Sequence, residues 1–381
     1  MEGFITRPSP RIAFGSGMLA KLPEFVREIG SLRPLLVTDK GIRSAGHLDH
    51  ALGYLEAAGI EVSVFDEVQE NPTNACIEAC RSFAEKAGID SFIGLGGGSS
   101  MDTAKGCNFL LTNGGGMKDY HGYGKATKPM LPFIAIPTTS GTGSECQSYA
   151  LISDDATHVK MACGDSKALA RLALLDPDLT ASQPQRIAIL TGLDALAHSV
   201  ETAVCLPRNP ISKIHSLEAF RLLARSIEAV VAGNADISDR SNMQIGAALA
   251  GLAIENSMLG AAHAGANPLT AFYDVTHGRA VALMLPHVIR FNKGDTLANE
   301  IYQSYEQWIP GGGDIADWFE SLVDKSGLAN LSGLGVADSE IAKLATAATQ
   351  QWTGRFNPRP VGQAEFEGLY RDALNRVAKN A

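Results

Sequence analysis

The chain contains 381 residues, of which 45% are hydrophobic and 19% are charged. Its 32 Lys and Arg residues stand against 41 Asp and Glu residues, which gives a formal net charge of -9. The apolar fraction is ample for a packed interior and argues against a disordered chain. The acidic balance argues against a non-specific nucleic-acid binder, because no basic surplus is available to neutralise phosphates. At this length two domains are expected.

Cysteine usage and hydropathy indicate the compartment. The six cysteines contain no Cys-x-x-Cys pair, which argues against a disulfide scaffold and a zinc ribbon and favours a reducing compartment. The first residues show no basic segment followed by an apolar core, so no secretory signal is expected. The longest uncharged stretch, residues 256–273, contains polar side chains that a membrane span tolerates poorly. We therefore expect a soluble cytoplasmic protein that binds neither membranes nor nucleic acid.

Strand-like and helix-like segments alternate in the first half of the chain. Strands are expected at residues 34–39, 60–65, 90–95 and 130–137, and helices at residues 48–58 and 74–87. This alternation predicts a parallel sheet covered by helices on both faces.

The pattern changes after residues 176–180. Helical patterns rich in Ala and Leu dominate from about Pro184 onward. The helices expected there span residues 187–205, 211–232, 242–257, 281–292, 315–322 and 366–378. We therefore expect an α/β domain over residues 1–180 and an all-helical domain over residues 181–381.

A glycine cluster follows the strand expected at residues 90–95. Gly96, Gly97 and Gly98 precede Ser99 and a helix-like segment. Glycines let the backbone approach an anion closely, and a helix start offers unpaired N–H groups, so this segment suits a pyrophosphate. Ser99 stands where the usual dinucleotide motif has a third glycine, and a glycine-rich turn without a ligand is the alternative.

Asp39 lies at the carboxyl end of the first of these strands. A carboxylate there can accept hydrogen bonds from both ribose hydroxyls of an adenosine and would repel a 2′-phosphate, which favours NAD over NADP. The alternative is an ordinary turn aspartate before Lys40.

A second polar loop, residues 137–145, follows another buried strand, and seven of its nine residues are Gly, Ser or Thr. Its composition suits phosphate or ribose binding, with an ordinary polar loop as the alternative.

Four residues of the second half have side chains that suit a transition metal. Asp194 and His198 are four residues apart in an expected helix, so they share a face and can point at one ion. We expect His263 on another helix and His277 at a turn. Three imidazoles and one carboxylate suit Fe²⁺ or Zn²⁺ better than Ca²⁺ or Mg²⁺. Such spacing also arises by chance, and hydrogen-bonded core histidines are the alternative.

With these residues in place, the sequence resembles the iron-containing (group III) alcohol dehydrogenase family over nearly its whole length. The segments that carry the resemblance follow the family's order and span residues 71–73, 96–105, 137–145, 176–180, 191–198, 277–278 and 285–287. The resemblance implies a Rossmann-like N-terminal dinucleotide-binding domain and an all-α C-terminal domain, in a dehydroquinate synthase-like architecture. It also implies an active site between the two.

The resemblance further implies which residues bind the metal and the cofactor. The metal ligands would be Asp194, His198, His263 and His277. The cofactor-binding residues would be Asp39, Asn71, Gly96, Gly97, Gly98, Ser99, Asp102, Thr138, Thr139, Thr142, Ser144, Lys160 and Leu179. One position departs from the family, because Asn267 stands where relatives carry a histidine credited with proton transfer. Asparagine forms hydrogen bonds but carries no proton at neutral pH, so a relay would run through water, cofactor hydroxyls or the substrate itself.

The expected activity is hydride transfer between NAD(H) and a small primary alcohol or aldehyde, with Fe²⁺ or Zn²⁺ acting on the substrate oxygen. The alternative on the same scaffold is a dehydrogenase of a small hydroxy acid or of an aldehyde with a phosphonate, sulfonate or carboxylate tail. Metal-free maleylacetate reductases, glycerol dehydrogenases and dehydroquinate synthases share the fold but fit these motifs less well. A metallohydrolase or a nucleotide-binding regulator would represent another class. A homodimer or a higher homo-oligomer is expected from the family.

Overall fold

A computed structural model describes residues 3–155, 160–328 and 330–376 of the chain. These residues form two compact units. One unit comprises Arg7–Gln183, and the other comprises Pro184–Ala381 together with the start of the chain up to Thr6. The boundary expected near residue 180 lies slightly earlier than this division, and the sequence assigned the first residues to the α/β domain instead.

The α/β unit is built on a parallel sheet, as the sequence predicts. In its described residues the strand order is β1 (Arg11–Phe14), β9 (Leu172–Leu175), β6 (Phe133–Pro137), β4 (Ser91–Gly96), β2 (Pro34–Val37) and β3 (Ser63–Phe65). Every neighbouring pair is parallel, and Leu36 of β2 pairs with Val64 on one side and with Ile93 on the other. The four strands expected from the sequence are therefore confirmed.

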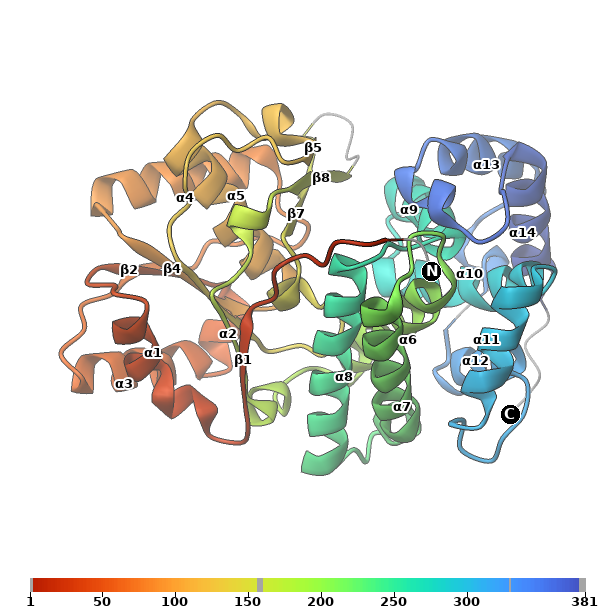
Figure 1. Cartoon of the computed structure of the whole chain (residues 1–381), viewed down its shortest axis with the longest axis horizontal. Coiled ribbons are helices and arrows are strands. Elements are labelled where there is room, and N and C mark those ends of the chain that lie inside the picture. The colour runs from red at the N-terminus through yellow and green to blue at the C-terminus, as the bar shows by residue number, and fades with distance from the viewer. Residues whose placement is uncertain (1–2, 156–159, 329, 377–381) are drawn as a thin grey trace. The chain divides into compact units, whose positions relative to one another are not determined.

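Helices cover both faces of this sheet (Figure 1). They are α1 (Leu22–Glu28) and α3 (His47–Ala57) on one face, with α4 (Asn74–Ala87) and α5 (Gly98–Asn113) on the other. Alternate side chains of each strand face opposite layers, so Leu36 packs with the first pair of helices while Leu35 and Val37 pack with the second. The short helix α2 (Lys40–Ser44) follows β2 directly.

Two features of the α/β unit were not expected from the sequence. The first is the pair of strands β1 and β9: β9 reads Leu-Ala-Leu-Leu, residue types that favour a helix over a strand, and β1 is the edge strand beside it. A second, smaller sheet has the order β5 (Gly122–Tyr123), β8 (Lys160–Gly164) and β7 (Tyr149–Ser153). Strands β7 and β8 pair antiparallel, and the polar loop of residues 137–145 leads into this sheet.

The described residues from 184 onward contain helices and no strand, which confirms the all-α prediction. The helices are α6 (Gln185–Val204), α7 (Pro210–Ala232), α8 (Ile237–Glu255), α9 (Ala261–Tyr273), α10 (His277–Asn292), α11 (Thr296–Glu306), α12 (Ile315–Lys325), α13 (Ile341–Thr349) and α14 (Gln363–Asn375). The sequence placed His263 on a helix but gave no bounds for α9, and it missed α11 and α13; the last residues predicted for α14 lie outside the described residues.

Single turns of 3-10 helix connect these elements. They lie at Met18–Lys21, Met117–Tyr120, Ser144–Cys146, Ser166–Ala168, Pro177–Thr180, Ser332–Leu334, Asp338–Glu340 and Trp352–Phe356.

The helix α6 forms the centre of the helical unit. Its Leu193, Leu196 and Val200 belong to the buried apolar cluster that α7, α8 and α10 also line. Among the described helices it alone is long and apolar enough to cross a membrane, but 83% of that apolar window is buried inside the structure. This burial shows that α6 is a core helix of the helical unit.

The neighbouring helix α7 shows how local sequence fixes a helix start. Asn209 precedes the helix, and its side-chain oxygen accepts hydrogen bonds from the backbone N–H groups of Ile211 (3.0 Å) and Ser212 (3.1 Å). Pro210 occupies the first helical position, where its missing N–H costs nothing.

One buried histidine makes the stability of the helical unit depend on pH. Burial of His287 on α10 lowers the pKa of its imidazole to about 4, although the carboxylate of Glu320 acts in the opposite direction. In the unfolded chain the same group has a pKa of about 6.5. Below pH 6.5 the unfolded state therefore takes up a proton that the folded state does not, and stability falls as the pH falls toward 4.

We expect the wild type to lose on the order of 2 kcal/mol of unfolding free energy through this group between pH 7 and pH 4.5. The variant His287→Gln should lack that component and show a flatter dependence. Urea unfolding midpoints at both pH values measure it. Equal pH dependence in the two proteins would contradict the assignment.

Candidate active site

The helix α6 presents three ionisable side chains on one buried face. Asp194, His198 and Glu201 stand at relative positions 0, 4 and 7, which lie above one another on a helix. All three are almost fully buried. The helix therefore carries a polar face into an otherwise apolar core, and this costs free energy unless each group finds a partner.

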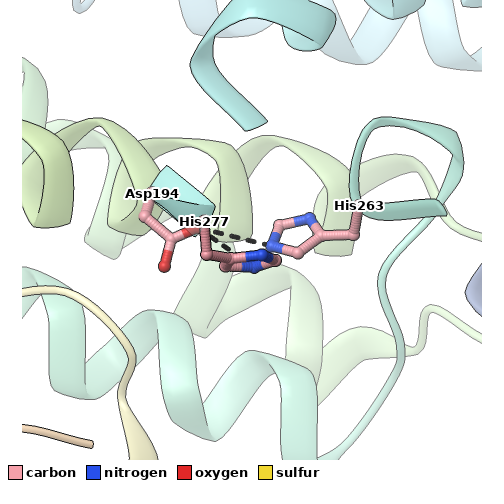
Figure 2. A group of neighbouring side chains, drawn as sticks. All are labelled: Asp194, His263 and His277. Atoms are coloured by element: carbon pink, nitrogen blue, oxygen red, sulfur yellow. Dashed lines mark ion pairs between the residues drawn. The ribbon is translucent and has the colours of Figure 1, made fainter. Parts of the chain in front are cut away.

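Two further histidines meet this face of α6. His263 lies in the first turn of α9, as expected of a helical residue, whereas His277 is the first residue of α10 and not part of a turn. Figure 2 shows the carboxylate of Asp194 directed at ring nitrogens of His263 and His277. The structure thus brings together residues from three helices that are far apart in the sequence.

The distances in this cluster suit the ligands of one metal ion. Asp194 Oδ1 lies 3.6 Å from His198 Nε2, 3.5 Å from His263 Nε2 and 4.0 Å from His277 Nε2. Ligand atoms about 2.1 Å from a tetrahedral ion are about 3.4 Å apart, so this spacing leaves room for one ion. The ligand atoms of Asp194, His263 and His277 all lie within 4.8 Å of one another. The ring of His198 stacks on that of His263 with a centroid distance of 4.8 Å.

The hydrogen-bonding pattern tests whether these residues fit a cation. Asp194 Oδ1 and His263 Nε2 are buried, and neither has a hydrogen-bond partner among the described residues. A buried carboxylate oxygen without a partner is costly, and a divalent cation would satisfy both atoms at once. The donor set, three imidazoles and a carboxylate, suits iron or zinc. The residues present therefore fit a metal ion.

The electrostatics of the cluster also favour positive charge. Burial alone would raise the pKa of Asp194, but the neighbouring imidazoles, above all His198, outweigh it and hold the pKa well below the usual range. Burial would likewise lower the pKa of His263, but the charges of Glu201 and Asp194 raise it to about 9. Two buried carboxylates thus attract either protons on imidazole or a metal cation.

Glu201 is a site residue that the sequence analysis missed. Its Oε2 accepts a hydrogen bond from His263 Nδ1, and its Oε1 accepts one from the backbone N–H of Ala262 at 2.7 Å. A carboxylate behind a metal-binding histidine is a recurring arrangement that orients the ring. The spacing of three residues after His198 placed Glu201 on the same face of α6 and could have revealed it.

Asn267 lies one turn after His263 on α9, and its side chain is held in place. Its Nδ2 donates a hydrogen bond to Gln351 Oε1 at 2.9 Å. Gln351 was not expected from the sequence, because 84 residues separate the two positions. The pair consists of two neutral amides, so it can form hydrogen bonds but offers no base.

A second candidate site lies in the α/β unit, at the carboxyl ends of the parallel strands. A cavity of about 780 Å³ opens beside β2, β3, β4 and β6. The chain continues from β2 to β3 on one side and then returns to place β4 on the other, so the loops after β2 and β4 diverge. Parallel sheets bind ligands in the crevice at such a point. The predicted cofactor residues on its wall are Asp39, Gly97, Ser99, Thr138 and Thr139.

The glycine loop shows why small residues are needed here. Gly96 has φ +148°, and a Cβ atom there would lie 2.4 Å from Ser100 Oγ. Gly97 caps the start of α5, whose first N–H groups face the loop. The backbone N–H of Asn71 donates to Ser99 Oγ at 3.3 Å, so this segment lies against the loop. Thr142, from the polar loop of residues 137–145, packs on Gly98.

Asp39 both caps a helix and lines the cavity. One carboxylate oxygen, Oδ1, accepts a hydrogen bond from the backbone N–H of Ile42 at 3.0 Å and caps α2. The side chain also lines the cavity, and its Oδ2 lies 3.5 Å from the Cβ position of Gly96. A capping aspartate at this place still presents negative charge to the cavity.

Eight of the predicted cofactor residues are not among those that line this cavity: Asn71, Gly96, Gly98, Asp102, Thr142, Ser144, Lys160 and Leu179. Asp102 and Ser144 instead form a buried network, in which Ser144 Oγ donates to Asp102 Oδ1 at 2.8 Å and accepts from Lys105 Nζ at 2.8 Å. Burial raises the pKa of Asp102 despite the nearby charge of Lys105. Lys160 begins β8, and Leu179 lies in the apolar core. The network holds the polar loop against α5.

Comparison with known proteins assigns both halves of the chain to one family. The model of the iron-containing alcohol dehydrogenases matches residues 9–177, and the model of the C-terminal domain of Fe-containing alcohol dehydrogenases matches residues 188–374. The chain belongs to the iron-containing alcohol dehydrogenase family. It is therefore an oxidoreductase, an alcohol dehydrogenase with an Asp/His/His metal site.

Individual relatives of this dehydrogenase differ in what they act on. The chain is 34% identical to "Alcohol dehydrogenase 4" of Schizosaccharomyces pombe over 95% of its length and 87% of that protein. A solved 1,3-propanediol oxidoreductase is similar with a TM-score of 0.92 at 31% identity, covering 98% of this chain and all of the other. The sulfoacetaldehyde reductase of Bifidobacterium kashiwanohense, solved in complex with NAD⁺, is similar with a TM-score of 0.89 at 26% identity, covering 99% and 100%.

Removal of one ligand tests the metal site. We expect His263→Ala to lose bound metal and activity together, while the far-ultraviolet circular dichroism stays that of the wild type. Metal content measured by elemental analysis, alongside turnover before and after chelation, provides the readout. Full turnover of the chelated variant would contradict the assignment.

Proposed function

We propose that this dehydrogenase transfers a hydride between NAD(H) and a small primary alcohol or aldehyde, with Fe²⁺, or Zn²⁺ in its place, held by Asp194, His198, His263 and His277. The observation that supports this most strongly is the buried carboxylate oxygen of Asp194, which faces three imidazoles and has no hydrogen-bond partner within the described part of the chain. NAD is supported by Asp39 at the cavity wall and by the relative that was solved with NAD⁺.

The residues of this chain divide the work between two sites. When bound, the metal acts as a Lewis acid that lowers the pKa of the substrate hydroxyl. Asp194 neutralises part of the ion's charge, and Glu201 fixes the ring of His263. The N–H groups at the start of α5 bind the pyrophosphate, while Asp39 accepts hydrogen bonds from the adenosine ribose. Asn267 donates a hydrogen bond to Gln351 and takes up no proton. The proton therefore leaves through water, through cofactor hydroxyls or through the substrate itself.

A second candidate substrate is an aldehyde with an anionic tail, or a small hydroxy acid. The likeness to the sulfoacetaldehyde reductase favours it. The likeness to the propanediol oxidoreductase favours a neutral substrate, and the identity to it is higher, 31% against 26%. We therefore keep the neutral alcohol as the main proposal.

We also propose that the enzyme is a cytoplasmic homodimer or higher homo-oligomer. The cytoplasmic location is supported by the six cysteines, all of which are buried and free although an oxidising compartment favours disulfides. The oligomer is proposed from the family resemblance.

A spectrophotometric panel tests the activity. We expect the enzyme loaded with Fe²⁺ to oxidise NADH, followed at 340 nm, with short unbranched aldehydes, and to lose at least 90% of this rate after chelation. Aldehydes with sulfonate, phosphonate or carboxylate tails form the second arm of the panel. Activity only in that arm would replace the main substrate class by the alternative, and no activity in either arm would refute the proposal.

The cofactor preference tests the role of Asp39. Asp39→Asn keeps a side-chain oxygen that can cap α2 but removes the charge. We expect kcat/KM with NADP⁺ to rise at least about fivefold relative to NAD⁺, because a carboxylate near a 2′-phosphate costs on the order of 1–3 kcal/mol.

A second carboxylate on the same cavity wall provides the control. Glu70 lines the cavity without capping a helix, and Glu70→Gln should change the preference much less. An unchanged preference in Asp39→Asn, or an equal shift in both variants, would count against a specific contact by Asp39.

A further inference from the structure

Glu201 contacts two different groups at the start of α9. Its Oε1 accepts the hydrogen bond from the backbone N–H of Ala262 at 2.7 Å, and its Oε2 accepts one from His263 Nδ1. The side chain is 3% exposed, so water does not share these contacts. One carboxylate therefore caps a helix and holds a metal-binding ring at the same time.

Both partners of Glu201 are hydrogen-bond donors. The backbone N–H of Ala262 can only donate. His263 must carry its proton on Nδ1 if the lone pair of Nε2 is to bind a metal ion, and Figure 2 shows the ring with one nitrogen toward Asp194 and the other turned away. Two donors at the two ends of one side chain require two acceptors, and among the natural side chains only a carboxylate provides both.

The neighbouring cap at the start of α9 differs in one respect. Asn357 Oδ1 accepts a hydrogen bond from the backbone N–H of Ala261 at 3.3 Å. A Cβ atom at Gly260, the residue before the helix, would lie 3.0 Å from Asn357 Oδ1 and 3.1 Å from Glu201 Oε1. The two side chains thus close on the same helix start, but the described contacts of Asn357 do not include His263.

We propose that Glu201 is a positioning residue of the metal site, whose two carboxylate oxygens fix the ring orientation and the proton position of His263 so that Nε2 faces the ion. The proposal rests on the metal-dependent function given above and adds to it the residue that prepares one ligand. Its action on metal binding is distinct from its capping of α9, because only one of its two oxygens contacts the ring.

Glu201→Gln replaces one of the two acceptor oxygens by an NH₂ donor with almost no change of shape. If the amide oxygen faces His263, the NH₂ group meets the N–H of Ala262. If the amide oxygen faces Ala262, the NH₂ group meets Nδ1 and favours the proton on Nε2, where it blocks the metal. Both orientations weaken the site, and we expect a loss of about tenfold to a hundredfold in metal affinity.

The experiment titrates metal-free protein with Co²⁺ in competition with a chelator, and reads the visible Co²⁺ absorption that reports coordination geometry. Wild type, Glu201→Gln and Asn357→Ala are compared, and the melting temperature of each metal-free protein is measured alongside. We expect Asn357→Ala to lower the melting temperature while its Co²⁺ affinity stays within about threefold of the wild type. Glu201→Gln should bind Co²⁺ at least tenfold more weakly with an altered spectrum.

Three results would overturn the proposal. Wild-type affinity in Glu201→Gln would show that the second acceptor is not needed. An equal loss of affinity in Asn357→Ala would show that Glu201 acts only as a cap. Failure of the wild type to bind Co²⁺ would refute the metal-dependent function as well, and so is distinguishable from the other two. If Glu201→Gln does not fold, Glu201→Asp, which keeps the charge but is one methylene too short to reach both donors, decides by the same criteria.

Discussion

The helical unit depends on how one buried negative charge is balanced. Asp194 projects from the core helix α6, and its Oδ1 faces imidazole nitrogens of three histidines at 3.5–4.0 Å. A carboxylate in such surroundings is stable only with positive charge nearby. This requirement explains why the first turns of α9 and α10 converge on α6, and why the histidines are placed at those first turns.

The α/β unit follows a different constraint, which is set by its backbone. Parallel strands end at the same edge, and the loops after β2, β4 and β6 meet there around a cavity. The absence of side chains at Gly96 and Gly97 leaves the backbone accessible at the cavity, and Asp39 supplies a carboxylate there. A buried hydrogen-bond network of Lys105, Ser144 and Asp102 holds the polar loop of residues 137–145 against α5. The nucleotide binding and the metal binding that we propose thus use separate physical principles in separate units of one chain.

Much of the fold could be predicted from local pattern. The helix α4 has the predicted bounds, because Thr73 caps it and Gly88 ends it in a left-handed conformation. The strands β2, β4 and β6 are apolar runs bounded by polar or glycine residues. In contrast, β9 consists of Leu and Ala, which favour a helix by composition, and the pairing of β1 with β9 and of β7 with β8 depends on partners that a single segment does not reveal.

The candidate site divides in the same way. Asp194 and His198 were predicted from their spacing. The same spacing places Glu201 on their face of α6, but its contact with His263, 62 residues away, is not encoded by a local pattern. The turn predicted at His277 was wrong because Gly278 was interpreted as a turn residue. In the structure this position requires glycine because of packing, since a Cβ atom at Gly278 would lie 2.3 Å from the carbonyl oxygen of Leu190. It permits close approach of α10 to α6. Asp102 and Ser144 were predicted to bind the cofactor because they match motifs of the family, but in the structure Ser144 Oγ donates a hydrogen bond to Asp102.

Anomalous X-ray diffraction from crystals grown with Fe²⁺ or Zn²⁺ tests the central claim most directly. Data collected on both sides of the absorption edge locate the ion independently of any assumed ligand. We predict one strong peak per chain within about 2.3 Å of Asp194 Oδ1 and of the Nε2 atoms of His198, His263 and His277. A map with no peak among these four side chains, or one with the histidines hydrogen-bonded to Asp194 and the ion bound elsewhere, would contradict the account.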